Sequence, residues 1–566
     1  MNSEFNVDAA EVDQSAISEN ATSHTARLLR LCEGEDMEFF HDASGTAYVT
    51  IAVDNQSGQG VHFETHPLRS SEFRLTLQHR YYREYERAIP VKILDETLAT
   101  LHARARFDGP ERVVWLRSAG DGSGIEIDLG TDDWISAHID ASGWKLGPHQ
   151  HRFYRSPSTK AFPLPERGGK LSELHAFTTN MESERDFALL SGFLVMSLYP
   201  RNLAPYVITI LLGEQGSAKT STSLYIQMLV DPSAAGVRSP SKNERDIAIA
   251  AQGSHLLVYD NLDVIPASVS DLFCRLSTGS TFSTRALYTD SSEILLYAQC
   301  PLVLNGIGDI ATRGDLLDRS VVIHLSPIRD NQRKTAKELN IEWQKAWPRL
   351  FGALLDAVAL SLRDRELVRQ SLKNRPRMAD FAEIAIAAEP AFGVSIGTVE
   401  RALSDQRESA SAQVVDVPLA LALRKFMQER DDWEGSASDL DTVLKKTFAN
   451  NISPQQWPRS AAALSRELER IAPALRQSDG IHYDRRAGTR RKIMLSRKPD
   501  ALSETVQIPS LSSLPSHLSR KEDANDGNDG NKLNTEPKEF ERNAYCSYNM
   551  REAETPFTDD AMEASL

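Results

Sequence analysis

The chain has 566 residues, of which 41% are hydrophobic and 25% are charged, and its formal net charge is −15. A chain of this length predicts about three domains plus tails, and its hydrophobic content is sufficient for sizeable folded cores. Because the chain is acidic, it is not expected to coat nucleic acid indiscriminately, so any contact with DNA must come from a local basic patch.

Cysteine spacing and hydropathy exclude several classes of protein. The four cysteines form neither a C-x-x-C pair nor a Cys/His set with zinc spacing, as expected for a reduced cytoplasmic protein. Residues 1–20 are polar and acidic, unlike a signal peptide. No apolar run approaches the ~18 residues needed to span a bilayer. We therefore expect a soluble, cytoplasmic protein without membrane contact.

Residues 1–25 are expected to form a disordered leader, and residues 36–165 an α+β N-terminal domain. Within that domain, residues 47–53, 112–117 and 124–130 have the composition of short strands, and residues 93–107 have the spacing of an amphipathic helix. Residues 155–169 are rich in Pro, Gly and Ser, which is typical of a linker.

The next part of the chain, residues 170–330, has the pattern of an α/β core. A helix is predicted over 187–200, and short apolar strands are predicted over 206–213, 255–261, 301–307 and 321–328. Apolar strands with helices between them indicate a parallel sheet covered on both faces. Residues 335–405 are expected to form a helical extension of this core, and residues 500–566 a disordered acidic tail.

The stretch GEQGSAKT, residues 213–220, nearly matches the phosphate-binding loop G-x-x-x-x-G-K-[ST]. A predicted strand precedes it and a predicted helix follows it, which is the context in which backbone N–H groups bind a phosphate. Lys219 would reach the β- and γ-phosphates of ATP, and Thr220 would hold Mg²⁺. The nucleotide-binding set is Gly213, Glu214, Gln215, Gly216, Ser217, Ala218, Lys219, Thr220 and Ser221.

Ala218 departs from this motif, which has glycine at that position. If the local φ is negative, one added methyl group costs little. The alternative is a chance match in a surface turn.

Two polar residues end neighbouring apolar strands. In LLVYDN, Asp260 has the place of a second magnesium ligand, and in PLVLNG, Asn305 has the place of a sensor between the γ-phosphate and the attacking water. Asn261 occupies the position where a glutamate would polarise that water, and an amide can orient water but cannot act as a general base. Nucleotide binding is therefore better supported than fast hydrolysis.

Arg313 and Arg319 follow the sensor strand. In ring-shaped ATPases, an arginine at this point reaches the γ-phosphate of the neighbouring subunit and stabilises charge in the transition state. The alternative for either residue is a surface salt bridge.

The C-terminal stretch 415–498 is expected to be a winged-helix DNA-binding domain. Helices are predicted over 417–433, 437–450 and 457–477, followed by strands over 481–486 and 490–498. Seven Lys or Arg residues and no acidic residue occur in 485–498, a local contrast that favours contact with DNA phosphates. The candidate DNA contacts here are Arg485, Arg486, Arg490, Arg491 and Lys492. A hairpin that binds a protein partner or the acidic tail is the alternative.

The three motifs GEQGSAKT, LLVYDN and LVLNG resemble motifs A, B and C of superfamily 3 helicases, which are AAA+ P-loop ATPases. The segment between the last two resembles poxvirus-type and phage primase–helicases, with Leu276, Gly279, Arg285 and Tyr288 in the corresponding places. This resemblance implies ATP and Mg²⁺ as cofactors and a homo-oligomeric, hexameric ring. It also implies that Arg285 contacts single-stranded or forked DNA in the channel of the ring.

Three functions remain open from the sequence. The first is an ATP-dependent DNA helicase or translocase of phage or mobile-element replication. The second is a slow nucleotide-dependent DNA-binding switch or loader, which recruits replication proteins without unwinding DNA and is favoured by Asn261. The third is a small-molecule P-loop kinase in which Arg313 and Arg319 act within one chain, although this leaves the basic C-terminal hairpin unexplained.

Overall fold

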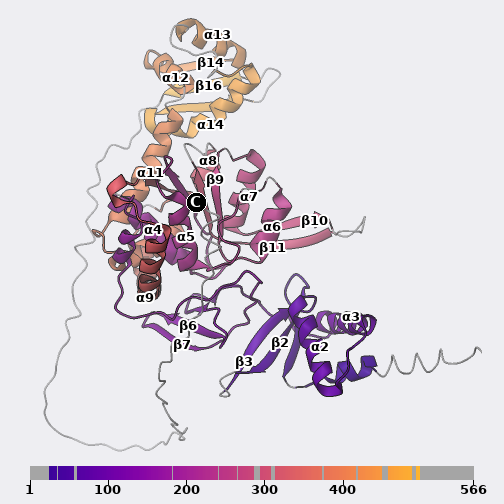
Figure 1. Ribbon diagram of the computed structural model, residues 1–566. Helices are drawn as coiled ribbons and strands as arrows, with labels where there is room; N and C mark the ends of the chain where they lie inside the picture. Colours follow the sequence, from indigo (N-terminus) through magenta and orange to yellow (C-terminus); the bar gives the residue numbers. More distant parts are fainter. Residues whose placement is uncertain are drawn as a thin grey trace, which may run out of the picture.

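The computed structural model of the protein describes residues 24–497, except for 35, 56–59, 182, 240, 242, 264, 286–292, 307–312, 373–374, 416–417, 449–456 and 487–491. The predicted leader and acidic tail fall almost entirely outside the described residues. Four packed regions follow one another along the chain (Figure 1). Among the described residues, no helix is both long and apolar enough to cross a membrane.

The N-terminal region is a small α+β unit. Its antiparallel sheet has the order β1-β2-β3, and its helices α2 and α3 bury Phe73, Leu77, Leu94 and Leu101 in a core of their own. The predicted strand at 47–53 and helix at 93–107 are confirmed. The elements are β1 Met37–His41, β2 Ala47–Asp54, β3 Val61–Pro67, α2 Ser71–Tyr85 and α3 Val91–Phe107.

A second antiparallel sheet follows, with the order β4-β5-β6-β7. Its strands are β4 Ser118–Gly120, β5 Ile125–Asp128, β6 Ile135–Asp140 and β7 Gly143–Pro148. The predicted strand at 124–130 is confirmed, but the one predicted at 112–117 is wrong. That run forms only an isolated bridge, between Trp115 and Phe153, and Val113 is 61% exposed. Its apolar residues therefore do not face a common core.

This second sheet shares its hydrophobic core with the region that follows. Ile127, Ala137 and Trp144 belong to the same buried cluster as the helices beyond residue 184. The stretch predicted as a linker, 155–169, has no helix or strand but is packed: the ring of Phe162 stacks on that of Phe351 with centroids 4.2 Å apart. Its composition therefore predicted the irregular backbone and not the packing.

The central region contains a four-stranded parallel sheet with the order β13-β8-β12-β9, which confirms the parallel sheet predicted from sequence. Buried residues on one face of the sheet pack with α4, α5 and α9, and those on the other face pack with α6 and α7. The strands are β8 Ile208–Gly213, β9 Leu257–Leu262, β12 Leu302–Gly306 and β13 Ser320–Leu325. The helices are α4 Glu184–Ser197, α5 Lys219–Val230, α6 Glu244–Gln252 and α7 Ala267–Thr278.

Two additions extend this sheet region. An antiparallel hairpin of β10, Ser280–Arg285, and β11, Glu293–Ala298, projects from the body of the molecule (Figure 1). A short helix, α8 Gly314–Leu317, precedes β13. The helices predicted over 335–405 are confirmed as α9 Ala336–Ser371, α10 Ala379–Ala388 and α11 Thr398–Val415.

The C-terminal region, residues 418–497, has its own core around Leu423, Leu444 and Leu468. Its elements are α12 Pro418–Gln428, β14 Asp432–Gly435, α13 Ala437–Phe448, α14 Ala461–Asp479, β15 Ile481–Arg486 and β16 Lys492–Arg497. The helix predicted over 417–433 ends at Gln428, because the following residues pair with the hairpin as β14. Trp433 lies opposite Leu495 in that pairing.

Candidate nucleotide-binding site

The GEQGSAKT stretch connects the carboxyl end of β8 to the start of α5. Gly213 is required by close packing, because a Cβ there would lie 2.4 Å from Ser217 Oγ and 2.5 Å from Leu325 O. Gly216 has φ +82°, a conformation that L residues rarely adopt. The local geometry therefore explains both glycines that the sequence retains.

Ala218 also has positive φ, at +50°, and it forms the N-cap of α5. The condition under which its methyl group would cost little, a negative φ, is therefore not met. An alanine in the left-handed region costs roughly 1–2 kcal/mol. The loop has the shape for which glycine is the favoured residue, and it holds that shape with alanine in place.

The Lys219 ammonium lies within the curve of the loop. Its Nζ donates to Gly213 O at 2.8 Å and to Glu214 O at 2.9 Å. Burial lowers the pKa of this ammonium, whereas the negative charge of Asp260 raises it. The loop therefore holds one positive charge among its own carbonyl oxygens, at the N-terminal end of α5.

Thr220 and Asp260 meet beside Lys219. The Thr220 hydroxyl donates to Asp260 Oδ2 at 2.7 Å. Thr220 lies in the first turn of α5, and Asp260 lies in β9, which is separated from β8 by β12. Hydroxyl and carboxylate oxygens are the hard ligands that Mg²⁺ prefers. The donor set therefore fits a magnesium ion.

Asn305, in β12, connects strand β9 to helix α5. Its Oδ1 accepts from Asn261 N and its Nδ2 donates to Ser223 Oγ, both at 2.9 Å. Its side chain is fully buried, so both ends of the amide are engaged inside the protein. Asn261 is exposed and has φ +57°, a region that asparagine tolerates better than most residues.

The side chains of Arg313 and Arg319 contact residues outside the loop of their own chain. Arg313 forms ion pairs with Asp271 at 2.9 Å and with Asp315 at 3.2 Å. The carbonyl of Arg319 accepts from Ile208 N at the first residue of β8, whereas the loop begins at Gly213, its last residue. Five residues of strand separate these points by roughly 16 Å.

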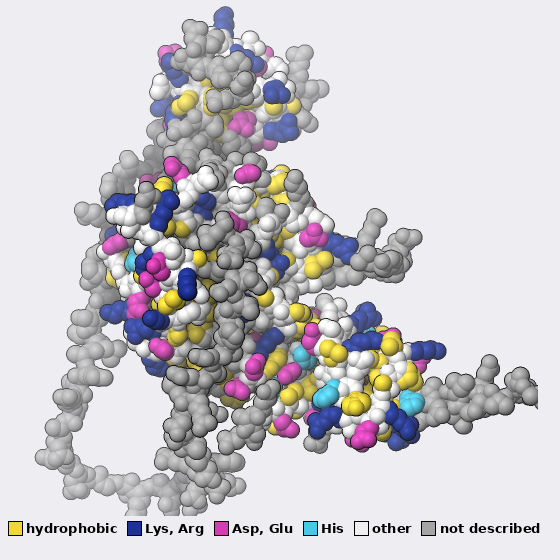
Figure 2. Space-filling model, in the orientation of Figure 1, with side chains coloured by type: hydrophobic (Ala, Val, Ile, Leu, Met, Phe, Trp, Pro, Cys, Tyr) yellow, Lys and Arg dark blue, Asp and Glu magenta, His cyan; other side chains and the backbone are white. Residues whose placement is uncertain are grey.

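The candidate DNA contacts are described in part. Arg485 pairs with Glu469 at 2.6 Å, and Lys492 pairs with Glu434 at 2.8 Å. Lys and Arg side chains lie around this C-terminal region at the top of Figure 2. The side chains of Arg285, at the end of β10, and Arg486, at the end of β15, fall outside the described part, as do Arg490 and Arg491.

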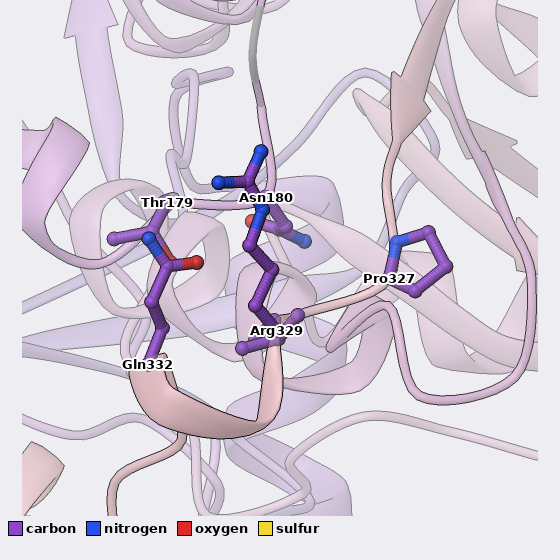
Figure 3. Close-up of a pocket in the computed structure, with 6 residues that line it drawn as sticks. Thr179, Asn180, Pro327, Arg329 and Gln332 are labelled. Carbon is purple, nitrogen blue, oxygen red and sulfur yellow. The ribbon is translucent and has the colours of Figure 1, made fainter.

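A cavity of about 310 Å³ lies against the loop, and the sequence did not predict it. The Asn180 side-chain amide donates to Ser217 O, and Ile328 N donates to Gly216 O at 3.2 Å. Figure 3 shows Arg329 extending toward Asn180, with Gln332 beside Thr179. The lining residues are Thr179, Asn180, Pro327, Ile328, Arg329 and Gln332.

One wall of this cavity could have been anticipated from the strand order, and the other could not. Residues 326–333 follow the strand β13, whose last residue lies opposite Gly213, so they emerge at the same edge of the sheet as the loop. The polar pair Thr179-Asn180 shortly precedes α4, but nothing in its local sequence indicates contact with Ser217.

Two parts of the chain match known protein families. Residues 171–409 match the family described as actinomycete integrative conjugative element replication protein, and residues 419–510 match the AICE RepA C-terminal domain. No curated protein matches the sequence.

Among solved structures, the one described as SCCmec type IV Cch, an active helicase, is 12% identical, with a TM-score of 0.44, and covers 81% of this chain and 92% of that chain. An apo structure of the NrS-1 C terminal region is 10% identical, with a TM-score of 0.35, and covers 84% of this chain and 99% of that chain. At TM-scores below 0.5, neither likeness transfers an activity to this chain. The family matches cover more than half of the sequence, and over these two ranges the chain is similar to the replication protein of a mobile genetic element.

Proposed function

We propose that this chain is a P-loop ATPase that drives a DNA helicase or translocase in the replication of a mobile element. The observation that carries the proposal is the contact of Thr220 with Asp260 beside Lys219. A hydroxyl, a carboxylate and an ammonium meet where a strand, a glycine-containing loop and a helix N-terminus come together. This is the combination that binds a magnesium–nucleoside triphosphate.

The residues of the loop would act as follows. Backbone N–H groups of 214–220 and the N-terminus of α5 bind the phosphates, and Lys219 leaves its loop carbonyls to pair with the β- and γ-phosphates. Thr220 and Asp260 would hold Mg²⁺. When bound, Mg²⁺ neutralises charge on the phosphate oxygens during attack of water on the γ-phosphorus. The products are ADP and inorganic phosphate.

The cavity beside the loop is proposed to take the nucleoside. Its volume of about 310 Å³ is at the lower end of ligand-site volumes, and hydrogen bonds tie both of its walls to the phosphate loop. The Asn180 and Gln332 amides supply donors and acceptors for the ribose or base. A nucleotide would then extend from this cavity to Thr220.

The position of Arg319 favours action between subunits. Its backbone lies roughly 16 Å along β8 from the loop, and its guanidinium donates to Asp315 O at 2.9 Å rather than to the loop. In a ring of about six copies, which the resemblance to AAA+ helicases implies, it would instead face the site of the neighbouring copy. The same position gives no support to the kinase hypothesis, which needs Arg319 to act within one chain.

DNA contact is proposed at two places. The β10–β11 hairpin, with Arg285 at its end, extends away from the body, as expected for an element that enters the channel of a ring. The C-terminal region has three helices and a sheet that contains the basic hairpin, an arrangement that fits a winged helix. Its resemblance to the C-terminal domain of a replication protein adds support.

A slow switch or loader is the second candidate, and Asn261 favours it. The residue next to Asp260 is an amide that cannot accept a proton from water, and Asn305, the expected sensor, has both polar ends occupied inside the protein. Either feature would slow hydrolysis without preventing nucleotide binding.

A strand-displacement assay on forked DNA separates the two candidates. The motor is expected to release the labelled strand only with ATP and Mg²⁺, and the Lys219→Ala variant is expected to release none. ATP-dependent DNA binding without strand release, in a preparation that binds nucleotide normally, would favour the switch.

A further inference from the structure

A buried arginine links the second antiparallel sheet to the phosphate-loop helix. Arg117 is 1% exposed, and its Nε donates to Asp231 Oδ1 at 3.0 Å. Its other nitrogens donate to the carbonyls of Asp128, Lys160 and Pro232 at 3.0–3.2 Å. The guanidinium therefore joins residues on both sides of the boundary between the two regions.

Asp231 connects this arginine to both elements that carry the magnesium ligands. It is the C-cap of α5, the helix that begins with Lys219 and Thr220. Its Oδ2 accepts from the backbone N–H groups of His255 and Leu256, at 2.8 and 3.2 Å, immediately before β9. One carboxylate thus fixes the end of α5 against the start of the strand that carries Asp260.

The residues after Asp231 reach Asp260 directly. Arg238 pairs with β9: its N–H donates to Val258 O at 2.9 Å, and its carbonyl accepts from Asp260 N at 3.0 Å. We call residues 231–238 the connector. On the other side of β9, the pairing with β12 is irregular between Leu304 and Gly306. The connector therefore supplies a regular hydrogen bond to the backbone of Asp260.

The connector is itself held by the stretch that leads from the second sheet into the central region. Lys160 N donates to Pro232 O at 2.9 Å, and Ala234 N donates to Ser158 O at 2.7 Å. Together with Arg117, these bonds attach the first half of the connector to residues outside the central sheet. A shift of the second sheet would therefore displace the first half of the connector. The other end of the connector, Arg238, is hydrogen-bonded to the backbone of Asp260.

We propose that Arg117 is a positioning residue for the magnesium site, acting through Asp231 and the connector on the carboxylate of Asp260. The proposal rests on the proposed function, since it assigns Asp260 to Mg²⁺. The second sheet would then help to set the affinity of the site for Mg²⁺.

A structural role for the Arg117–Asp231 pair is the alternative. Breaking a buried ion pair by removing one partner leaves an uncompensated charge and destabilises a protein, whatever its function. The two roles differ in what else changes: positioning predicts a specific loss of Mg²⁺ affinity, and a structural role predicts only lower stability.

The experiment uses the full-length chain and three variants. Arg117→Lys keeps the charge but loses the planar set of donors. The double variant Arg117→Gln/Asp231→Asn removes both charges, which avoids an unpaired buried ion. Arg155→Lys is the matched control, because Arg155 binds Asp128 in the same sheet. Its other contacts within the described part of the chain, with Thr131 O and the Trp134 ring, also lie outside the connector.

The first measurement is a Mg²⁺ titration of the binding of a fluorescent ADP analogue. We expect the half-saturating Mg²⁺ concentration to rise roughly 2- to 30-fold in both Arg117 variants, the range seen for residues that transmit an effect between sites. Binding without Mg²⁺ and the control variant should match the wild type. Folded Arg117 variants with wild-type Mg²⁺ dependence would overturn the proposal.

The second measurement is amide hydrogen exchange in the absence of nucleotide and metal. Positioning predicts faster exchange at 257–260 in the Arg117 variants and not in Arg155→Lys. This measurement does not depend on the proposed function. If the wild type binds no magnesium–nucleotide, the proposed function fails. Hydrogen exchange at 257–260 would still show whether Arg117 stabilises β9. Unchanged exchange at 257–260 would contradict the proposed connection.

Discussion

The Thr220 hydroxyl donates to Asp260 Oδ2 at 2.7 Å, although the two residues are 40 positions apart in sequence. The contact depends on the parallel sheet, because the carboxyl ends of β8 and β9 lie at the same edge, with β12 between them. The meeting of the two residues beside Lys219 gives the region its candidate chemistry.

Replacing Thr220 tests whether the pair holds a metal. Thr220→Val keeps the shape and removes the hydroxyl, and Thr220→Ser keeps the hydroxyl. Mg²⁺-dependent nucleotide affinity is expected to fall at least about tenfold in the valine variant, because loss of one supporting group costs a metal site that much, and to stay near wild type in the serine variant. Isothermal calorimetry with ADP, with and without Mg²⁺, measures both. Equal affinities for the two variants would remove Thr220 from the metal site.

Ala218→Gly should relieve strain in the loop. The alanine has φ +50°, and glycine adopts this conformation freely, but glycine also makes the unfolded chain more flexible. The expected net gain in the free energy of unfolding is about 0.5–1 kcal/mol, with nucleotide affinity kept or improved.

A helical alanine serves as the control for that substitution. Ala250→Gly in α6 is expected to destabilise by about 1 kcal/mol, because glycine is unfavourable within a helix. Urea unfolding of both variants gives the comparison. If Ala218→Gly lost as much stability as Ala250→Gly, the positive φ would be wrong.

His255 gives the protein a specific sensitivity to acid. Burial lowers the pKa of this imidazole from 6.5 to about 4, and its Nε2 is 2.6 Å from Ser197 O. Below pH 6.5 the unfolded chain binds a proton at this residue and the folded chain does not. The stabilising contribution is therefore complete above pH 6.5 and is lost as the pH falls toward 4.

The change that isolates this contribution is His255→Gln, which keeps an N–H donor and does not titrate. Between pH 6.5 and 4, the stability of the wild type relative to the variant is expected to fall with a slope approaching about 1.4 kcal/mol per pH unit. Unfolding midpoints in urea at several pH values measure the difference. Parallel pH curves for the two proteins would show that His255 does not titrate differently on unfolding.

Two described cations of the basic hairpin, Arg485 and Lys492, form ion pairs with Glu469 and Glu434. If they bind DNA phosphates, neutralising their partners with Glu469→Gln and Glu434→Gln should raise DNA affinity. Arg485→Gln and Lys492→Gln should each lower the slope of log K against log salt by roughly 1. Lys92→Gln, at an exposed position in α3, is the control. Salt slopes that do not differ from the control would exclude the hairpin from the DNA interface.

The sequence predicted those parts of the site that a local motif marks, namely a polar residue or loop directly after an apolar strand. The loop, Asp260 and Asn305 each follow an apolar strand, and parallel strands bring their carboxyl ends together, so the meeting of Thr220 with Asp260 could be anticipated. The conformation of Ala218 could not, because its φ depends on how the whole loop folds, including the close approach of Gly213 to Ser217 and Leu325.

Long-range contacts account for what the sequence did not predict. Arg117 belongs to a run that resembles a strand, yet it is buried against Asp231, 114 residues away. Asn180 reaches Ser217 from a stretch without any motif. The strand β14 was not predicted, and its first residues were assigned to the end of a helix. Asp432–Gly435 becomes a strand because it pairs with the free edge of β16, a contact that the local sequence does not indicate.

Steady-state ATP hydrolysis with and without single-stranded DNA, beside a Lys219→Ala control, tests the central claim most directly. A working motor is expected to hydrolyse ATP with strong stimulation by DNA, and the control is expected to lose both the basal and the stimulated rates. Magnesium-dependent ATP binding without appreciable turnover, with or without DNA, would contradict the motor and leave the switch, with Asn261 as the first residue to examine.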